Sequence, residues 1–211
     1  MNMDILSIIL GWLLGMLSPV IVNRIYRHYK KNDLYGGLSK EINHITERLI
    51  VTLQLLSNRT GSFDRDLVTW LLEHYEKIET KNPQTLKVYR MFVKASDDEL
   101  NEIKRSYATS SGSGLSLQKF PLLFINMHLS DFSLFSPELQ AEIFELKSRI
   151  EILNSGIASS EKYFFMTFDS SISTESQLII KTDLTNKYIQ VETMIKRAVE
   201  QIETVNSVKK I

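Results

Sequence analysis

The chain of 211 residues has no cysteine and few of the residues that interrupt helices, with 4 prolines and 8 glycines. The absence of cysteine excludes a disulfide framework, a thiol nucleophile and a cysteine-based zinc site. The scarcity of turn-forming residues, together with 43% apolar residues in heptad-like spacing, favours helices over a β-sandwich or barrel. The sequence therefore predicts an all-α protein.

Net charge is also absent, because 25 basic residues balance 25 acidic residues. No overall field draws such a chain toward a polyanion. Direct binding of genomic DNA is therefore not expected, and any basic character has to be local.

Motifs that signal catalysis or metal binding are missing as well. His28, His44, His74 and His128 lie in four different segments, without the spacing of a metal-binding pair. The sequence contains no GxSxG, Rossmann or Walker pattern. We therefore expect no enzymatic activity and no bound cofactor or metal ion.

One acidic triplet, residues 97–99, has the composition of a cation site. Ser96 followed three residues later by Glu99 matches a capping box, in which two side chains satisfy the first amides of a helix. No further ligand cluster accompanies the triplet. The pattern therefore predicts the start of a helix at this point.

The longest stretch without a charge lies near the N-terminus, from Ile5 to Val22. As a helix it would be about 27 Å long, close to the thickness of the hydrocarbon core of a membrane. A cleaved secretory signal needs a positively charged leader and a small-x-small cleavage site, and this segment has neither. We therefore expect residues 1–31 to form a single transmembrane helix with a basic flank.

The basic flank follows the apolar run directly and has no counterpart on the other side. The positive-inside rule then predicts an N-terminus outside the membrane and a cytoplasmic domain over residues 32–211. The same side chains suit contact with anionic lipid. They are Arg24, Arg27, Lys30 and Lys31.

Small residues recur at helical spacing inside the apolar run and form one face of the expected helix. Such a face lets helices approach closely in lipid, so it predicts self-association. Its members are Ser7, Gly11, Gly15 and Ser18. Pro19 predicts a bend near the inner end. Asn23 then marks either the end of the helix or the mouth of an oligomeric pore.

Seven helices are expected in the cytoplasmic domain, with the pair Gly36-Gly37 as a hinge near the start of the first. The stretch 115–135 is unusually apolar and predicts a buried helix or a segment that contacts a partner. The expected helices span residues 34–57, 64–81, 83–95, 97–108, 115–135, 137–168 and 175–207.

The last two helices carry apolar residues in steps of four and three, which is the pattern of a coiled coil. Joined by a short polar turn, they predict a long antiparallel hairpin that closes within one chain or packs against the hairpins of other chains. The seam comprises Leu139, Ile143, Leu146, Ile150, Leu153, Ile157, Leu184, Val191, Ile195 and Ile202.

The layout of the whole chain resembles the small single-span membrane effectors of bacterial anti-phage defence, in particular the channel effector of Hailong-type systems. The resemblance is carried by the segments GWLLGMLSP and RIYRHYKK and by the two heptad helices. It implies an ion-conducting homo-oligomer in the bacterial inner membrane, held closed by a cytoplasmic regulatory protein or a nucleotide-type ligand on the helical bundle.

The function expected from these features is a gated pore formed by identical subunits. Cyclic closure is the usual arrangement of such subunits, and a tetramer is one of its forms. The alternative is a membrane-tethered coiled-coil adaptor that recruits a cytoplasmic partner without conducting ions.

Overall fold

The computed structural model describes the backbone of residues 2–79, 81–108 and 115–209, and within these ranges the side chains from residue 11 onward except 107 and 108. The regular structure of the described chain is entirely helical, without a strand, so the all-α prediction is confirmed. Its elements are α1 (Asn2–Thr60), α2 (Arg65–Glu76), α3 (Pro83–Lys94), α4 (Asp97–Ala108), α5 (Leu123–Met127), the 3₁₀ helix η1 (Asp131–Leu134), α6 (Pro137–Met166) and α7 (Thr174–Lys209).

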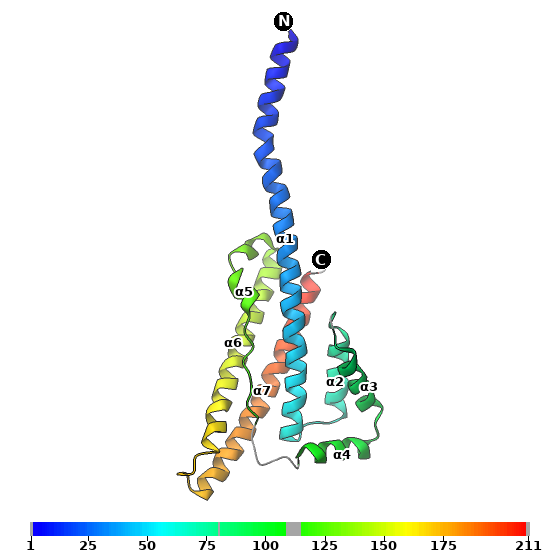
Figure 1. The fold of residues 1–211 in the computed structure, drawn as a ribbon, viewed down its shortest axis with the longest axis vertical. Coiled ribbons are helices and arrows are strands. Elements are labelled where there is room, and N and C mark those ends of the chain that lie inside the picture. The colour runs from blue at the N-terminus through cyan, green and yellow to red at the C-terminus, as the bar shows by residue number, and fades with distance from the viewer. Residues whose placement is uncertain (1, 80, 109–114, 210–211) are drawn as a thin grey trace.

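Helix α1 is continuous over 59 residues, and its first half projects beyond the other helices (Figure 1). The helix predicted at 34–57 is therefore only the second half of α1. The prediction of a hinge at Gly36-Gly37 is wrong, because α1 runs through both glycines without interruption. Two glycines weaken a helix by about 1 kcal/mol each, but the neighbouring Leu34 and Leu38 are buried, and this packing holds the helix together.

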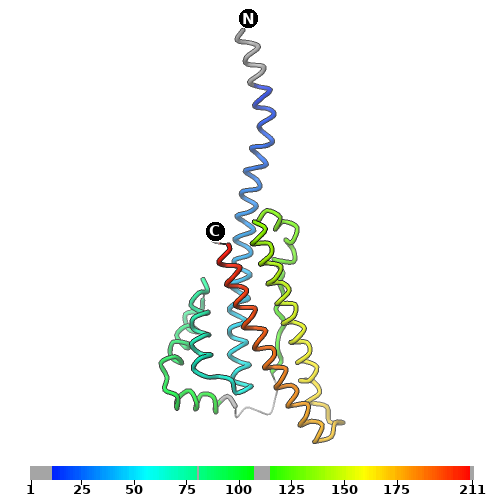
Figure 2. Tube along the Cα trace, turned by 180° about the vertical axis from the view of Figure 1, so that it is seen from behind, coloured from blue at the N-terminus to red at the C-terminus, as the bar shows by residue number. Residues whose placement is uncertain are grey.

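Helices α6 and α7 form the predicted antiparallel hairpin, and α7 also lies along the second half of α1 (Figure 2). Ser136 begins α6 by accepting a hydrogen bond from the backbone N–H of Leu139 at 3.3 Å, and Pro137 occupies the first turn, where its missing amide does no harm. The observed bounds differ from the predicted 137–168 and 175–207 by two residues at most.

Helices α2, α3 and α4 form a lobe on the other side of α1 (Figure 1). Asp64 caps α2 through the backbone N–H of Leu67 at 2.8 Å, and Asn82 caps α3 through that of Gln84 at 2.9 Å. The helix predicted at 64–81 ends earlier, at Glu76. The helices predicted at 83–95 and 97–108 correspond to α3 and α4.

The single helix predicted over 115–135 is wrong, since residues 115–122 run without regular structure and only α5 and η1 follow. We call residues 115–122 the strap. The side chains of α6 and α7 satisfy its backbone: the Tyr188 hydroxyl bonds both the C=O and the N–H of Leu115, and the Asn154 amide bonds both groups of Phe120. Pro121 also disfavours a helix here.

Most of the large apolar side chains of residues 115–135 belong to the core. Of the two predicted roles for this stretch, burial in the core therefore applies to most of it, and contact with a partner does not. Phe120, Leu122, Ile125, Phe132 and Phe135 are buried. Leu123 and Met127, on the outer side of α5, remain 66% and 78% exposed.

No helix among the described residues contains a stretch that is long and apolar enough to cross a membrane. The predicted span rests on the apolar run from Ile5 to Val22, and the side chains of this run are described only from Gly11 onward.

Replacing Asn154 by Ala tests the attachment of the strap. The Asn154 side chain accepts the Phe120 N–H at 2.7 Å and donates to its C=O at 2.9 Å, so the substitution leaves two backbone groups unpaired. We expect a loss of about 1–3 kcal/mol in the free energy of unfolding, measured by denaturant titration. The neighbouring, exposed Ser155→Ala serves as the control and should change it by less than about 0.5 kcal/mol. Equal effects would show that the amide does not hold the strap.

Candidate functional site

The stalk, which we define as residues 11–29 of α1, is uncovered within the described chain. All of its side chains are exposed, including Trp12 at 63% and Val20 at 64%. Contiguous exposed apolar surface marks a contact with lipid or with another protein. The stalk is therefore the first part of the candidate site.

The predicted small-residue face lies on the stalk, and α1 brings Gly11, Gly15 and Ser18 onto one side of the helix. A Cβ atom added at either glycine would meet nothing within 4 Å. Ser7 also lies in α1, but its side chain is outside the described set. Asn23 is exposed but follows Ser18 by five residues, which places it about 140° around the helix, away from this face.

The four basic residues of the flank divide into two pairs. Arg24 and Arg27 are exposed, as contact with lipid requires. Lys30 instead donates a hydrogen bond to Asp131 at 2.5 Å, and the ammonium of Lys31 lies 5.6 Å from the centre of the Tyr35 ring. The structure therefore gives Lys30 and Lys31 partners inside the chain.

Residues 123–135, which we call the collar, lie against α1 just below the stalk (Figure 1). Helix α5 has no capping side chain of its own. The carboxylate of Glu41 on α1 instead accepts the backbone N–H groups of Phe124 and Ile125, at 2.7 and 2.9 Å. These amides would otherwise lack a partner at the helix start, so α1 supplies the cap that α5 needs.

Gly37 makes the close packing of the collar possible. A Cβ atom at this position would lie 2.2 Å from the ring of Phe124, so only glycine leaves room for that ring. Two residues earlier, the Tyr35 ring lies 4.5 Å from that of Phe135. The collar thus fits against α1 by aromatic packing as well as by the Glu41 cap.

Polar contacts join the collar to α1 at the end of the collar that lies nearest the stalk. The Asp131 carboxylate contacts Lys30 and also lies 3.2 Å from Nδ1 of His128. The hydrogen bond from Lys30, and then that from His128, holds the pKa of the Asp131 carboxyl below its usual range. The same bond to Asp131 raises the pKa of Lys30. Lys30, Asp131 and His128 therefore form a charged clasp between stalk and collar.

The ten predicted seam residues lie inside the hairpin of one chain and are buried there. On the same hairpin, a Cβ atom added at Gly156 would lie 2.8 Å from Sδ of Met194, which shows how closely α6 and α7 approach. The seam residues are Leu139, Ile143, Leu146, Ile150, Leu153, Ile157, Leu184, Val191, Ile195 and Ile202.

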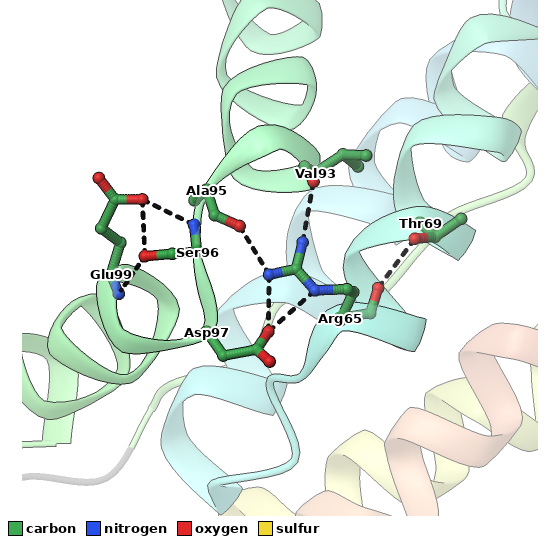
Figure 3. Close-up of polar contacts among 7 residues, drawn as sticks. All are labelled: Arg65, Thr69, Val93, Ala95, Ser96, Asp97 and Glu99. Carbon is green, nitrogen blue, oxygen red and sulfur yellow. Dashed lines mark hydrogen bonds and ion pairs between the residues drawn. The ribbon is translucent and has the colours of Figure 1, made fainter.

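The acidic triplet is a helix start, as predicted. The Glu99 carboxylate accepts the backbone N–H of Ser96 at 2.6 Å, and the Ser96 hydroxyl accepts the N–H of Glu99 at 3.3 Å (Figure 3). The bond from the Ser96 N–H, and then a bond that the Ser96 hydroxyl donates to the same carboxylate at 3.0 Å, lower the pKa of Glu99. Asp97 pairs with Arg65 at 2.7 Å, and the same guanidinium donates to the carbonyls of Val93 and Ala95 (Figure 3). Arg65 thereby joins α2 to the turn between α3 and α4.

The described histidines have separate surroundings. His28 contacts Asn32, His44 is exposed, His74 stacks on Trp70, and His128 belongs to the clasp. In the described part of the chain, no three acidic or imidazole side chains are grouped so that they could hold a metal ion.

No protein-family model, no curated protein and no solved structure matches this chain. The described chain belongs to the all-helical structural class. It is a helical bundle whose central helix extends into an exposed apolar stalk.

Several residues that hold the collar against α1 are not among the predicted site residues. Glu41, Gly37 and Asp131 are separated by many residues from Phe124 and Ile125, from Phe124 and from Lys30 respectively, and no local spacing relates these partners. The pair Gly36-Gly37 was the one available signal, since glycine inside a helical pattern also occurs where another group approaches closely.

Replacing Gly37 and Gly36 by Ala in turn provides a matched test of the collar. Gly37→Ala forces Phe124 or α1 to move, and we expect a loss of about 1–3 kcal/mol in unfolding free energy. Gly36→Ala meets open space and should raise it by about 0.5–1 kcal/mol, because Ala favours the helix. Thermal denaturation followed by circular dichroism measures both. A Gly37→Ala protein as stable as the parent would contradict the close packing.

Asp131→Asn tests the clasp through hydrogen exchange of the collar amides. Since folding lowers the pKa of Asp131, its stabilisation is present above about pH 4 and is lost as the pH falls through the lowered value. The raised pKa of Lys30 means that its contribution is lost only above about pH 10. We expect lower protection factors of the collar amides, each rate being referred to the intrinsic exchange rate at the same pH, in Asp131→Asn at pH 7 and in the parent at low pH. Asp98→Asn, at an exposed carboxylate in α4, should leave the collar unchanged, and equal exchange in both variants would refute the clasp.

Proposed function

We propose that this protein is a membrane-anchored subunit of a homo-oligomeric gated pore. The observation that carries the proposal is the continuity of α1, in which an exposed apolar stalk extends without a break from the central helix of a folded bundle. A rigid connection of this kind suits a device in which a change in the bundle reaches the membrane helix.

The proposed span comprises residues 5–22, with the N-terminus outside and the bundle in the cytoplasm of a bacterial cell. Its support is the charge-free run and the exposed apolar side chains of its described part, such as Trp12, Leu14 and Leu17. Arg24 and Arg27, exposed just beyond the run, suit the cytoplasmic headgroups and anionic lipid.

The proposed contact between subunits is the face formed by Ser7, Gly11, Gly15 and Ser18. In lipid, helices associate by close packing, which small residues permit. Asn23 points about 140° away from Ser18, so within this proposal it lies outside the packed face, at the inner mouth of the pore.

For the biological role we propose anti-phage defence, on the strength of the resemblance in layout to Hailong-type channel effectors. The proposed trigger is a nucleotide-type ligand or a cytoplasmic regulatory protein. A groove of about 500 Å³ along α3 supports a binding role for the bundle. Lys87 and Lys94 border its apolar lining, which suits an anionic group on an otherwise apolar ligand, whereas Arg90 is paired with Glu76 at 2.8 Å.

The alternative is a tethered adaptor, and the tip of the α6–α7 hairpin favours it. Phe165, Phe168, Leu178 and Ile179 are 58–68% exposed there, at the end farthest from the stalk (Figure 1). Exposed apolar clusters of this type mark contacts with other proteins.

Membrane potential, followed with a voltage-sensitive dye in bacterial cells that express the full chain, tests the pore. We expect depolarisation, and we expect the combined change Gly11→Leu and Gly15→Leu to abolish it because leucine separates the packed helices. Leu13→Ile with Leu17→Ile, on the opposite side of the helix, should leave it intact. Depolarisation that persists in the double leucine variant would contradict packing through the glycine face.

An exchange of residues 1–22 for an unrelated membrane anchor separates the two functions. A pore loses its activity in this chimera, whereas an adaptor keeps it. Sizing of the detergent-solubilised full chain adds the decisive control, since a strict monomer excludes the homo-oligomeric pore.

A further inference from the structure

A groove runs between the second half of α1 and the strap, which lie next to each other in the bundle (Figure 2). Its volume is about 410 Å³. Val51 and Leu55 of α1 belong to one wall, and Leu115 and Leu117 of the strap belong to the other. Arg48 lies toward the end nearer the stalk. The groove therefore has apolar side chains on both walls and a charged side chain at one end.

The hydrogen bonds of the strap backbone are those of an extended chain. At Leu115, and again at Phe120, the N–H and the C=O bond the same side chain of the α6–α7 hairpin. This arrangement, in which both groups of one residue point to the same side, is typical of a β-strand. The C=O of Lys119 points the other way, to Arg48 of α1 at 3.3 Å. Successive residues at this end of the strap thus direct their main-chain groups to opposite sides.

The middle of the strap has main-chain groups without a partner. The N–H and C=O groups of Ser116, Leu117 and Gln118 form no hydrogen bond with any described residue. By the alternation, the groups of Leu117, two residues before Lys119, face α1 and the groove. The side chains of Ser116 and Gln118 are exposed, so this backbone is accessible. An unpaired strand edge of this kind is a template for pairing with another chain.

The charges at the end of the groove nearer the stalk supply a second and independent observation. Lys119 is exposed there and forms no ion pair with any described residue. Arg48 lies beside it, with its guanidinium on the Lys119 C=O. The carboxylate of Glu47, also at this end, already accepts a hydrogen bond from the Tyr75 hydroxyl at 2.8 Å. Two cations and one anion leave this end positive, which complements a carboxylate.

We propose that this groove binds an extended peptide segment of another protein, which pairs through its main chain with strap residues 116–118. Peptides recognised in this way add a strand to a free edge, and pockets for alternate side chains select among them. Val51, Leu55 and Leu117 suit apolar side chains, and the positive end suits an acidic one. The occupant is therefore an apolar peptide with an acidic residue at one end. The inference does not depend on the proposed pore.

Fluorescence anisotropy of labelled peptides with the purified full chain tests the main-chain pairing. The probes are hexapeptides with aspartate at one end or the other, in which valine, leucine or phenylalanine alternates with threonine. Each is compared with two forms that are N-methylated at alternate amides. We expect binding, and we expect one methylated form to bind about tenfold more weakly because main-chain bonds are lost. No binding by any probe at about 1 mM, or equal binding by all three forms, would overturn the proposal.

A matched pair of variants locates the bound probe. Leu55, 47% exposed in the groove, and Leu178, 68% exposed at the tip of the α6–α7 hairpin, are each replaced by Glu. Leu55→Glu should weaken binding about tenfold or more, because it sets a charge against apolar side chains, and Leu178→Glu should not. Lys119→Gln should weaken the probes with aspartate by up to about fivefold, but not their asparagine counterparts. Loss of binding in Leu178→Glu alone would place the peptide at the tip and refute the groove.

Hydrogen exchange of the full chain provides a measurement that needs no variant. Without a probe, the amides of residues 116–118 should exchange rapidly, whereas those of Leu115 and Phe120 should be protected by their hydrogen bonds. A saturating probe should slow at least one amide of residues 116–118 by about tenfold or more. Protection of all three amides in the free chain, or of none in the complex, would count against main-chain pairing at the strap.

Discussion

The packing of α1 against α7 is the contact on which the rest of the molecule depends. The apolar side of α1, with Leu38, Ile42 and Leu49, is fully buried in the bundle, and each such side chain contributes about 1.5–3 kcal/mol when it leaves water. This burial keeps α1 helical through two consecutive glycines. It also makes one rigid helix serve as stalk and as central core element, so the bundle and the stalk have no joint between them.

Features that depend on local sequence were predicted well. The heptad positions of α6 and α7 are buried as expected, because a long helix repeats its inner side at a fixed period. The start of α4 is predicted from Ser96 with Glu99, since a cap involves side chains only a few residues apart. In these elements the local preference and the tertiary structure agree.

Features that depend on distant contacts were not predicted. The stretch 115–135 is apolar enough for a helix, but Asn154 and Tyr188 satisfy the backbone of its first part in an irregular conformation, and nothing in the stretch itself signals them. Lys30 was assigned to topology and lipid from its position in a basic cluster, whereas its partner Asp131 is 101 residues away. Of the candidate site, the stalk could be found from sequence and the collar could not.

Helix α1 and the helix α7 that packs on it are far apart in the sequence, and this distance has a consequence during synthesis of the chain. Thr60, at the end of α1, bonds Glu192 of α7, 132 residues later. At ordinary rates of translation, α1 leaves the ribosome on the order of ten seconds before α7. During that interval α2, α4 and the collar can pack on α1, but the side that α7 covers has nothing of its own chain to pack against. Within the proposed membrane anchoring, early capture of the first segment by the membrane would hold nascent chains apart until α7 arrives, and would thereby protect folding as well.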